Sequence, residues 1–389
     1  MKTLAIVVAL TAGCSWSQFS DLSNQTPLHG QSAPDSDQSD YAVGIVNVAA
    51  PGSPGELAVL SGSPPNYSTL GLEANGATNE TFSEGLGDFS LNALSSHPAF
   101  ASDDAGNVAI VEIGVDKGLV LIDGTADKLS DQGLATTEPV GGATFAGSTI
   151  VVAAAPSSGK PNGFVIGTTA LNCDLAEPGG SAMDIVALAS DGSDVYAYGR
   201  DGLVVSYDLS ALTSGCTTSE TPMTPVPTKG STTIAPAQNG GYLALVGTFA
   251  IAVAFDSASS TTGMVTVVDV TTMTAVGTSI AASGVQSAAF GNFGASPGMP
   301  ALALGFPTRT VGTTTDVGEV ELHLVDAASG SVDPDAGETL SIPQAGGDLL
   351  FGRGVAAVTF NGATILVAAA NNEVYTYYAT SLYGDTRQQ

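Results

Sequence analysis

The chain has 389 residues and a formal net charge of −28, because only 9 Lys and Arg oppose 37 Asp and Glu. Nucleic-acid binding needs clustered cations, so this balance argues against a nucleic-acid partner. The 48 Gly and 20 Pro punctuate short apolar runs that are typical of strands and their turns. These features predict an all-β protein, and we expect no helix after the first dozen residues.

The chain begins with MKTLAIVVALTAGC, in which one lysine and an apolar stretch precede small residues, as in a secretory leader. The segment LTAGC resembles the lipobox of bacterial lipoproteins, although Thr11 stands where that family usually has an aliphatic residue. The resemblance implies a signal peptide over residues 1–13, fatty acyl chains on Cys14 and, because Ser15 follows, an outer-membrane location. The alternative is an ordinary secreted protein in which Cys14 is unmodified.

Residues 14–40 are rich in Ser, Gln and Asp and show no hydrophobic periodicity. Such a composition cannot bury enough apolar surface to order itself, so we expect a flexible tether. The folded body is then predicted to span residues 41–389.

The body shows a repeating pattern of short strands, each repeat having a small residue at the end of its second strand. Seven such marks, about 51 residues apart, are Gly62, Gly114, Ala154, Gly199, Gly247, Gly305 and Ala369. Units of this length suit four antiparallel strands, and one unit cannot cover both of its faces. The pattern therefore predicts a seven-bladed β-propeller, with a pair of β-sandwiches as the alternative.

Segments of the repeats resemble known propeller families. FGNFGASPGMPALALGFP (290–307) resembles the FG-GAP repeat of integrin α-chain propellers, and GMVTVVDVTTMTAVGTSI (263–280) is similar to YVTN-type surface-layer propellers. Both resemblances imply a propeller and neither implies catalysis. The FG-GAP family usually binds Ca²⁺ through an acidic loop, but the matching loop here has no carboxylate. No cofactor is expected, and the remaining candidates for a calcium site are Asp103, Asp104 and Asn107.

Two cysteines remain in the body, Cys173 and Cys216, at comparable places in adjacent units. In a compartment that permits disulfides they are expected to form one, and two buried thiols are the alternative. A catalytic role is not indicated, because the pair lacks CxxC spacing and has no neighbouring histidine.

The few cations suggest a binding face. Loops between second and third strands, and loops between units, emerge on one rim of a propeller. Six cations are assigned to these loops: Lys117, Lys160, Arg200, Lys229, Arg309 and Arg353. We expect them to bind an acidic protein or glycan, unless Asp116, Asp201 and Asp316 in the same loops neutralise them.

No nucleophile motif, P-loop or zinc-ligand spacing is present, and His323 lies alone within a predicted strand. The segment SDDAG (102–106) resembles the start of a sialidase Asp-box without its tryptophan, and Arg200, Arg309 and Arg353 are the arginines available to clamp a carboxylate. The sequence favours a surface-anchored binding, adhesion or envelope-scaffold module that is not an enzyme. A propeller hydrolase or lyase acting on acidic glycans is the alternative.

Overall fold

The computed structural model describes the chain from residue 140 to residue 378, with gaps at 168, 222–223, 258–261, 293–299, 313, 336–337, 342–349, 361–362 and 371–372. Before residue 140 it describes Glu138 and the strands named below. The predicted signal peptide and Cys14 therefore lie outside the described residues. Within the described part of the chain, no helix is long and apolar enough to cross a membrane.

The described strands form seven antiparallel sheets of four strands each. The first three sheets contain β2 (Gly44–Asn47), β3 (Glu56–Ser61), β4 (Asn66–Leu72) and β5 (Thr78–Gly85); β6 (Ala99–Ser102), β7 (Asn107–Ile113), β8 (Gly118–Gly124) and β9 (Leu129–Leu134); and β10 (Val140–Ala146), β11 (Thr149–Ala154), β12 (Gly163–Ile166) and β13 (Ala170–Cys173). The all-β class and the four-stranded unit are thus confirmed.

The next three sheets contain β14 (Ile185–Ser190), β15 (Asp194–Gly199), β16 (Leu203–Asp208) and β17 (Thr228–Thr233); β18 (Gly241–Val246), β19 (Phe249–Ala254), β20 (Met264–Asp269) and β21 (Thr274–Ala281); and β22 (Ser287–Gly291), β23 (Ala301–Phe306), β24 (Glu319–Leu324) and β25 (Glu338–Leu340). The seventh combines β26 (Gly354–Phe360), β27 (Ala363–Ala369) and β28 (Glu373–Tyr378) with β1 (Gly30–Ser32).

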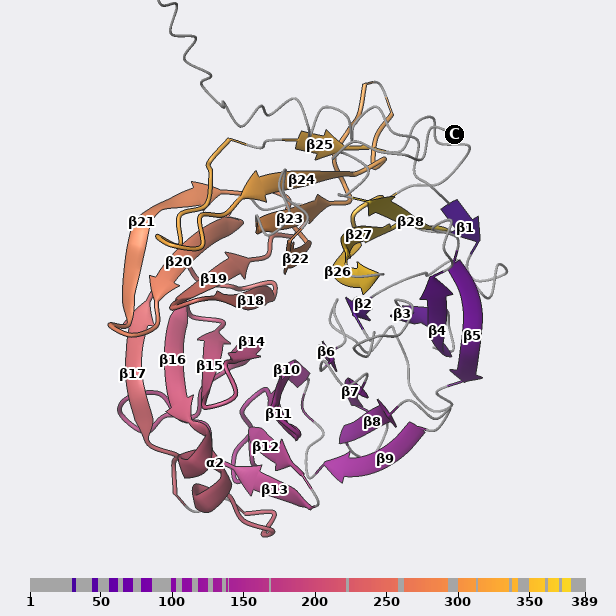
Figure 1. Ribbon diagram of the computed structural model, residues 1–389. Coiled ribbons are helices and arrows are strands. Elements are labelled where there is room, and N and C mark those ends of the chain that lie inside the picture. Colours follow the sequence, from indigo (N-terminus) through magenta and orange to yellow (C-terminus); the bar gives the residue numbers. More distant parts are fainter. Residues whose placement is uncertain are drawn as a thin grey trace, which may run out of the picture.

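The sheets fan around a common centre, with the first strand of each nearest the middle (Figure 1). Each first strand contacts the first strand of the next sheet, and β26 contacts both β22 and β2. The hydrophobic clusters lie between consecutive sheets: one joins β7 to β11 and β12, and another joins β23 and β24 to β26, β27 and β28. Because both faces of a sheet are covered in this way, β23 is buried at every position rather than at alternate ones.

One strand lies within the segment that was predicted to be a tether. Gly30–Ser32 lies inside the segment predicted to be flexible, yet it pairs along β28, with Gly30 beside Tyr375 and Ser32 beside Glu373. Backbone hydrogen bonding to an open strand edge does not depend on apolar side chains, which explains why the polar segment GQS gave no strand pattern.

Two further expectations are corrected. Gly247 does not end a second strand: it forms the turn between β18 and β19 with φ +57°, and β19 runs on to Ala254. A short helix, α2 (Leu209–Gly215), also follows β16. The Asp208 carboxylate caps it by accepting a hydrogen bond from the Ala211 N–H at 3.0 Å. The helix is too short to be stable alone, so its stability depends on packing.

Candidate functional site

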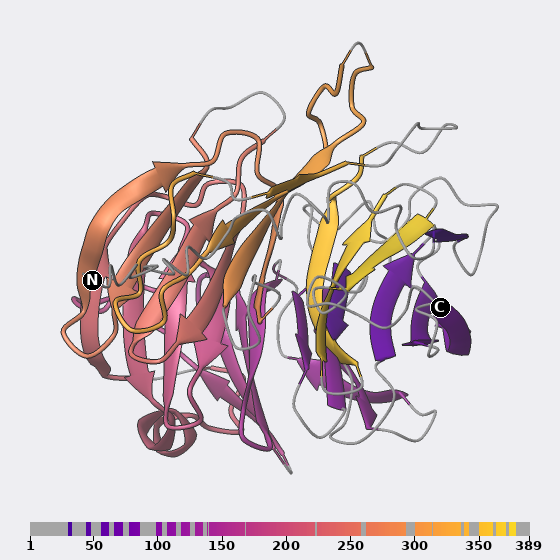
Figure 2. The same cartoon turned by 45° about the horizontal axis from the view of Figure 1, so that its top comes forward.

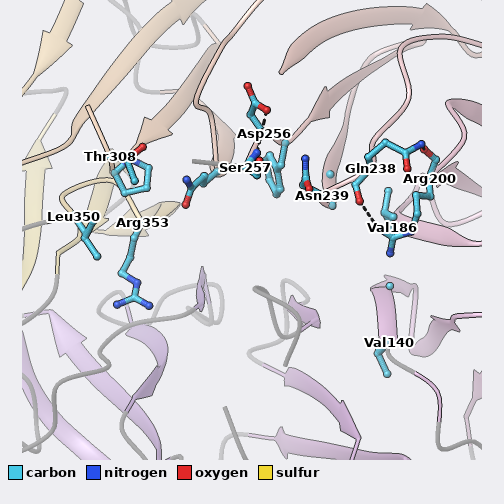
Figure 3. A pocket seen from close by; sticks show the side chains of 16 residues that line it. Val140, Val186, Arg200, Gln238, Asn239, Asp256, Ser257, Thr308, Leu350 and Arg353 are labelled. Carbon is cyan, nitrogen blue, oxygen red and sulfur yellow. Dashed lines mark hydrogen bonds between the residues drawn. The ribbon is translucent and has the colours of Figure 1, made fainter. Parts of the chain in front are cut away.

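A cavity of about 520 Å³ opens at the rim where second strands end. Its wall comes from loops that follow second strands and from connections that lead into first strands, as expected for a shared rim (Figure 3). Its polar lining includes Arg200, Gln238, Asn239, Asp256, Gln286 and Arg353. Phe255, Val140, Val186 and Leu350 supply apolar surface. The cavity therefore combines charged, hydrogen-bonding and apolar groups, as ligand sites commonly do.

Arg200 directly follows β15, in a tight turn that continues through Gly202 with φ +94°. Its Nε donates to Asp184 Oδ2 at 2.8 Å, and its Nη1 donates to the Gln238 carbonyl at 2.5 Å. Its side chain is 40% exposed. Arginine carries five N–H donors, so these bonds fix the guanidinium while leaving donors that can reach a ligand.

Arg353 reaches the same cavity from the seventh sheet, just before β26. In Figure 3 its half-buried side chain lies beside Leu350 and Thr308, at the end of the cavity far from Arg200. Its backbone N–H donates to the Leu350 carbonyl at 3.0 Å, which closes the turn that carries the side chain. Leu350 has φ +61°, an uncommon conformation for this residue type. Such strain is often found at binding sites, so the turn fits a functional role.

Asp256 is the one acidic residue among those that line the cavity within the described chain. Only 3% of the residue is exposed, and its carboxylate accepts hydrogen bonds from the Ser257 N–H at 3.0 Å and the Gly284 N–H at 3.1 Å. The carboxylate is therefore held by backbone donors. The charged groups of the cavity lining are thus Arg200, Arg353 and Asp256, and Arg200 is also paired with Asp184.

Arg309 lies on the same rim but does not line this cavity. Its guanidinium is ion-paired with Glu319 and Glu321 and stacks over the Phe306 ring at 3.6 Å from the centroid. Although burial opposes the charge, hydrogen bonds from His323 and Arg309 lower the pKa of Glu321. The ion pairs hold Arg309 outside the cavity. Arg200, Arg309 and Arg353 therefore do not form the three-arginine clamp that a sialidase would need.

Asp201 and Asp316 are not the ion-pair partners of Arg200 and Arg309, and Asp116 lies outside the described residues. Asp184 pairs with Arg200, whereas Asp201 accepts a hydrogen bond from the Leu203 N–H at 3.1 Å. The ion-pair partners of Arg309 are glutamates of β24. These ion-pair partners cannot be deduced from the loops that contain the arginines, because Asp184 precedes β14 and the glutamates belong to a strand.

The prediction that Lys229 shares this rim is wrong. It lies in β17, and its Nζ donates to both carboxylate oxygens of Asp194, at 2.7 and 2.6 Å. Asp194 begins β15, so this pair lies at the rim opposite Arg200, which follows the end of that strand. Lys160 is exposed in the β11–β12 loop outside the cavity lining, and Lys117 lies outside the described residues.

Of the other candidate residues, Asn107 and His323 form no site within the described part of the chain. Asp103 and Asp104 lie outside the described residues, and Asn107 begins β7. In the described part of the chain no three Asp, Glu, His or Cys side chains form a metal cluster. His323 is buried in β24, where Nδ1 lies 2.9 Å from the Asp333 carbonyl and Nε2 lies 3.4 Å from Glu321. These bonds give the imidazole a structural role.

The predicted disulfide between Cys173 and Cys216 is confirmed. It joins the end of β13 to the residue after α2, and so links the third and fourth sheets away from the cavity.

Several cavity residues carried no recognisable sequence signal. Gln238, Asn239 and Gln286 lie in connections between sheets, and no spacing sets them apart from other polar loop residues. Asp256 was detectable only as an acid two residues after the end of a buried strand.

Neither a protein-family model nor a curated protein matches this chain, so the FG-GAP and YVTN resemblances have only their residue patterns for support.

Proposed function

We propose that the protein is a seven-bladed β-propeller of the bacterial envelope that binds a carboxylate-bearing partner in the arginine-lined cavity. The propeller assignment is supported by seven sheets of one strand order and by contacts between successive first strands. The pairing of β1 with β28 supports it as well, because it joins the last sheet to the beginning of the chain. Mutual covering of sheets protects the edges that isolated sheets would expose.

The observation that carries the binding proposal is that Arg200 and Arg353 both line the cavity. They come from the fourth and seventh sheets, yet they line one cavity. A guanidinium is planar and presents paired N–H groups that match a carboxylate. Partial desolvation in the cavity strengthens this attraction relative to open water.

Charge reversal at the two arginines tests the proposal. Arg200→Glu and Arg353→Glu are each expected to weaken binding to soluble polygalacturonate or poly-L-glutamate about 10- to 100-fold, since a hydrogen bond to a charged group contributes roughly 1.5–3 kcal/mol. Binding should be measured by calorimetry at two salt concentrations and should weaken at the higher one.

The matched control is Lys160→Glu, which makes the same charge change on the same rim but outside the cavity. Its affinity is expected to stay within about twofold of the unmodified protein, since an exposed charge at a distance is screened. Melting curves verify that each variant is folded. Equal losses for all three variants would show a diffuse charge effect, and unchanged binding at Arg200 and Arg353 would remove the cavity from the proposal.

The envelope location is proposed from the lipobox-like segment and supported by the disulfide, because such bonds persist in oxidising compartments. Cys14→Ser is expected to release the protein from the membrane fraction, because loss of the acyl chains removes the anchor. Fractionation of expressing cells with labelled palmitate measures this. Label that persists on the variant, or unchanged fractionation, would contradict lipidation at Cys14.

A further inference from the structure

The disulfide fastens part of the fourth sheet's chain to the outer edge of the third sheet. Residues 209–227 leave the fourth sheet after β16 and return to it at β17, and Cys216 in this connection is bonded to Cys173 in β13. The helix of the connection, α2, lies next to β13 (Figure 1) and is the coiled ribbon at the lower left of Figure 2. Because β13 is the last strand of the third sheet, no other strand of that sheet covers its outer edge.

Hydrogen bonds to Asn172 place the connection along this edge. The Asn172 N–H donates to the Thr217 carbonyl at 2.7 Å, and the Thr217 N–H donates to the Asn172 carbonyl at 2.9 Å. The Asn172 side chain adds a bond from Nδ2 to the Ser219 carbonyl at 2.9 Å. The connection therefore covers backbone groups that an open sheet edge would offer to another chain.

Few buried side chains anchor this part of the connection. Leu212 and Val226 are buried at its two ends. Between them, Cys216 is the one buried residue that the structure describes, and residues 213–215, 217–221 and 224–225 are exposed. Hydrogen bonds at an exposed position contribute little alone, because water competes for both groups. The disulfide is therefore the main attachment of this stretch between its buried ends.

We propose that the disulfide is a redox-sensitive clasp: on reduction, residues 216–221 leave β13 and uncover the backbone groups of Asn172, while the sheets stay folded. A thiolate of a dithiol reductant attacks Cys216 Sγ, because Cys216 is 7% exposed against 1% for Cys173. The Sγ–Sγ bond breaks, Cys173 leaves as a thiol, and the second thiol of the reductant then displaces Cys216. The reductant supplies two electrons and two protons and becomes a disulfide itself.

The opening is confined by attachments that do not involve the cysteines. At one end, the Val226 N–H donates to the Asp174 carbonyl at 2.9 Å. At the other, Asp208 caps α2 and Leu212 is buried. The strands on either side of the connection, β16 and β17, are paired with each other. Residues 216–221 can therefore move away without separating the sheets.

Hydrogen exchange of single amides, followed by nuclear magnetic resonance with and without dithiothreitol, tests the clasp under native conditions. Reduction is expected to speed the exchange of the Asn172 and Thr217 amides about tenfold or more, because local opening exposes both to water. The Val226 amide is the internal reference, and its rate should change less than about twofold. Cys173→Ala/Cys216→Ala should show the fast exchange without the reagent and no response to it.

Asn172→Ala is the matched control, because it removes the side-chain bond to Ser219 and keeps the disulfide. The Thr217 amide should stay protected in this variant while it is oxidised. Slow exchange of Thr217 in the reduced protein would overturn the clasp, since the hydrogen bonds alone would then hold the stretch. An equal increase at Val226 would overturn it too, because the opening would then extend beyond residues 216–221.

Discussion

Gly305→Ala is expected to lower the free energy of unfolding by about 3 kcal/mol, since overpacking and a broken buried hydrogen bond each cost roughly 1–3 kcal/mol. A Cβ atom at Gly305 in β23 would lie 2.0 Å from the Gly352 carbonyl oxygen and 2.2 Å from Ser287 Oγ. Neither neighbour can simply rotate away, because the Ser287 hydroxyl donates to that same carbonyl at 2.6 Å. The sixth and seventh sheets would have to separate.

Equilibrium denaturation by urea measures the effect as a lower transition midpoint. Gly167→Ala is the matched control, because Gly167 is exposed and the Thr149 Oγ1 atom beside it would be 4.0 Å from an added Cβ. Its midpoint should be nearly unchanged. A midpoint for Gly305→Ala equal to that of the control would show that these two sheets do not pack as closely as described. Because Gly352 adjoins Arg353, the change should also weaken binding in the cavity.

Loss of the disulfide is expected to destabilise the protein by about 4 kcal/mol on the chain-entropy estimate for a loop of this length. Cys173 and Cys216 are 43 residues apart in sequence, so the bond constrains a long segment of the unfolded chain. Both sulfurs lie in buried residues, and alanine replaces them without placing a new polar group in the core. The variant is therefore Cys173→Ala/Cys216→Ala.

The measurement is urea denaturation with and without a reducing agent. Reduction should lower the midpoint of the unmodified protein toward that of the double variant, and should leave the double variant itself unchanged. Since the bond lies away from the cavity, ligand affinity under native conditions should be retained. A double variant as stable as the oxidised protein would contradict a stabilising role for the bond.

Much of the strand content could be predicted from the sequence, because it depends on short apolar runs and turn residues. ALALGF became β23, buried throughout, and TILVAA lies within β27. Gly247 was wrongly taken as the end of a second strand, because apolar runs of similar strength lie on both sides of it. Only the pairing of strands shows that the run after Gly247 is the second strand of its sheet.

The elements that were missed depend on partners distant in sequence. β1 is a strand because β28 offers it an edge, and three polar residues cannot indicate that. For the candidate site, loop positions alone brought Arg200 and Arg353 to one rim. The acids that fix Arg200 and Arg309, and the position of Lys229 across the sheet, depend on how strands pair and could not be deduced from loops.

The direction of β1 determines how the body is presented. It runs antiparallel to β28, and its last residue, Ser32, lies beside Glu373, where β28 begins on the cavity side. Gly30 therefore marks the entry of the chain from the far side of the disc. An anchor at Cys14, as proposed, would thus be joined to the body through β1, whose first described residue lies farther from the cavity rim than its last.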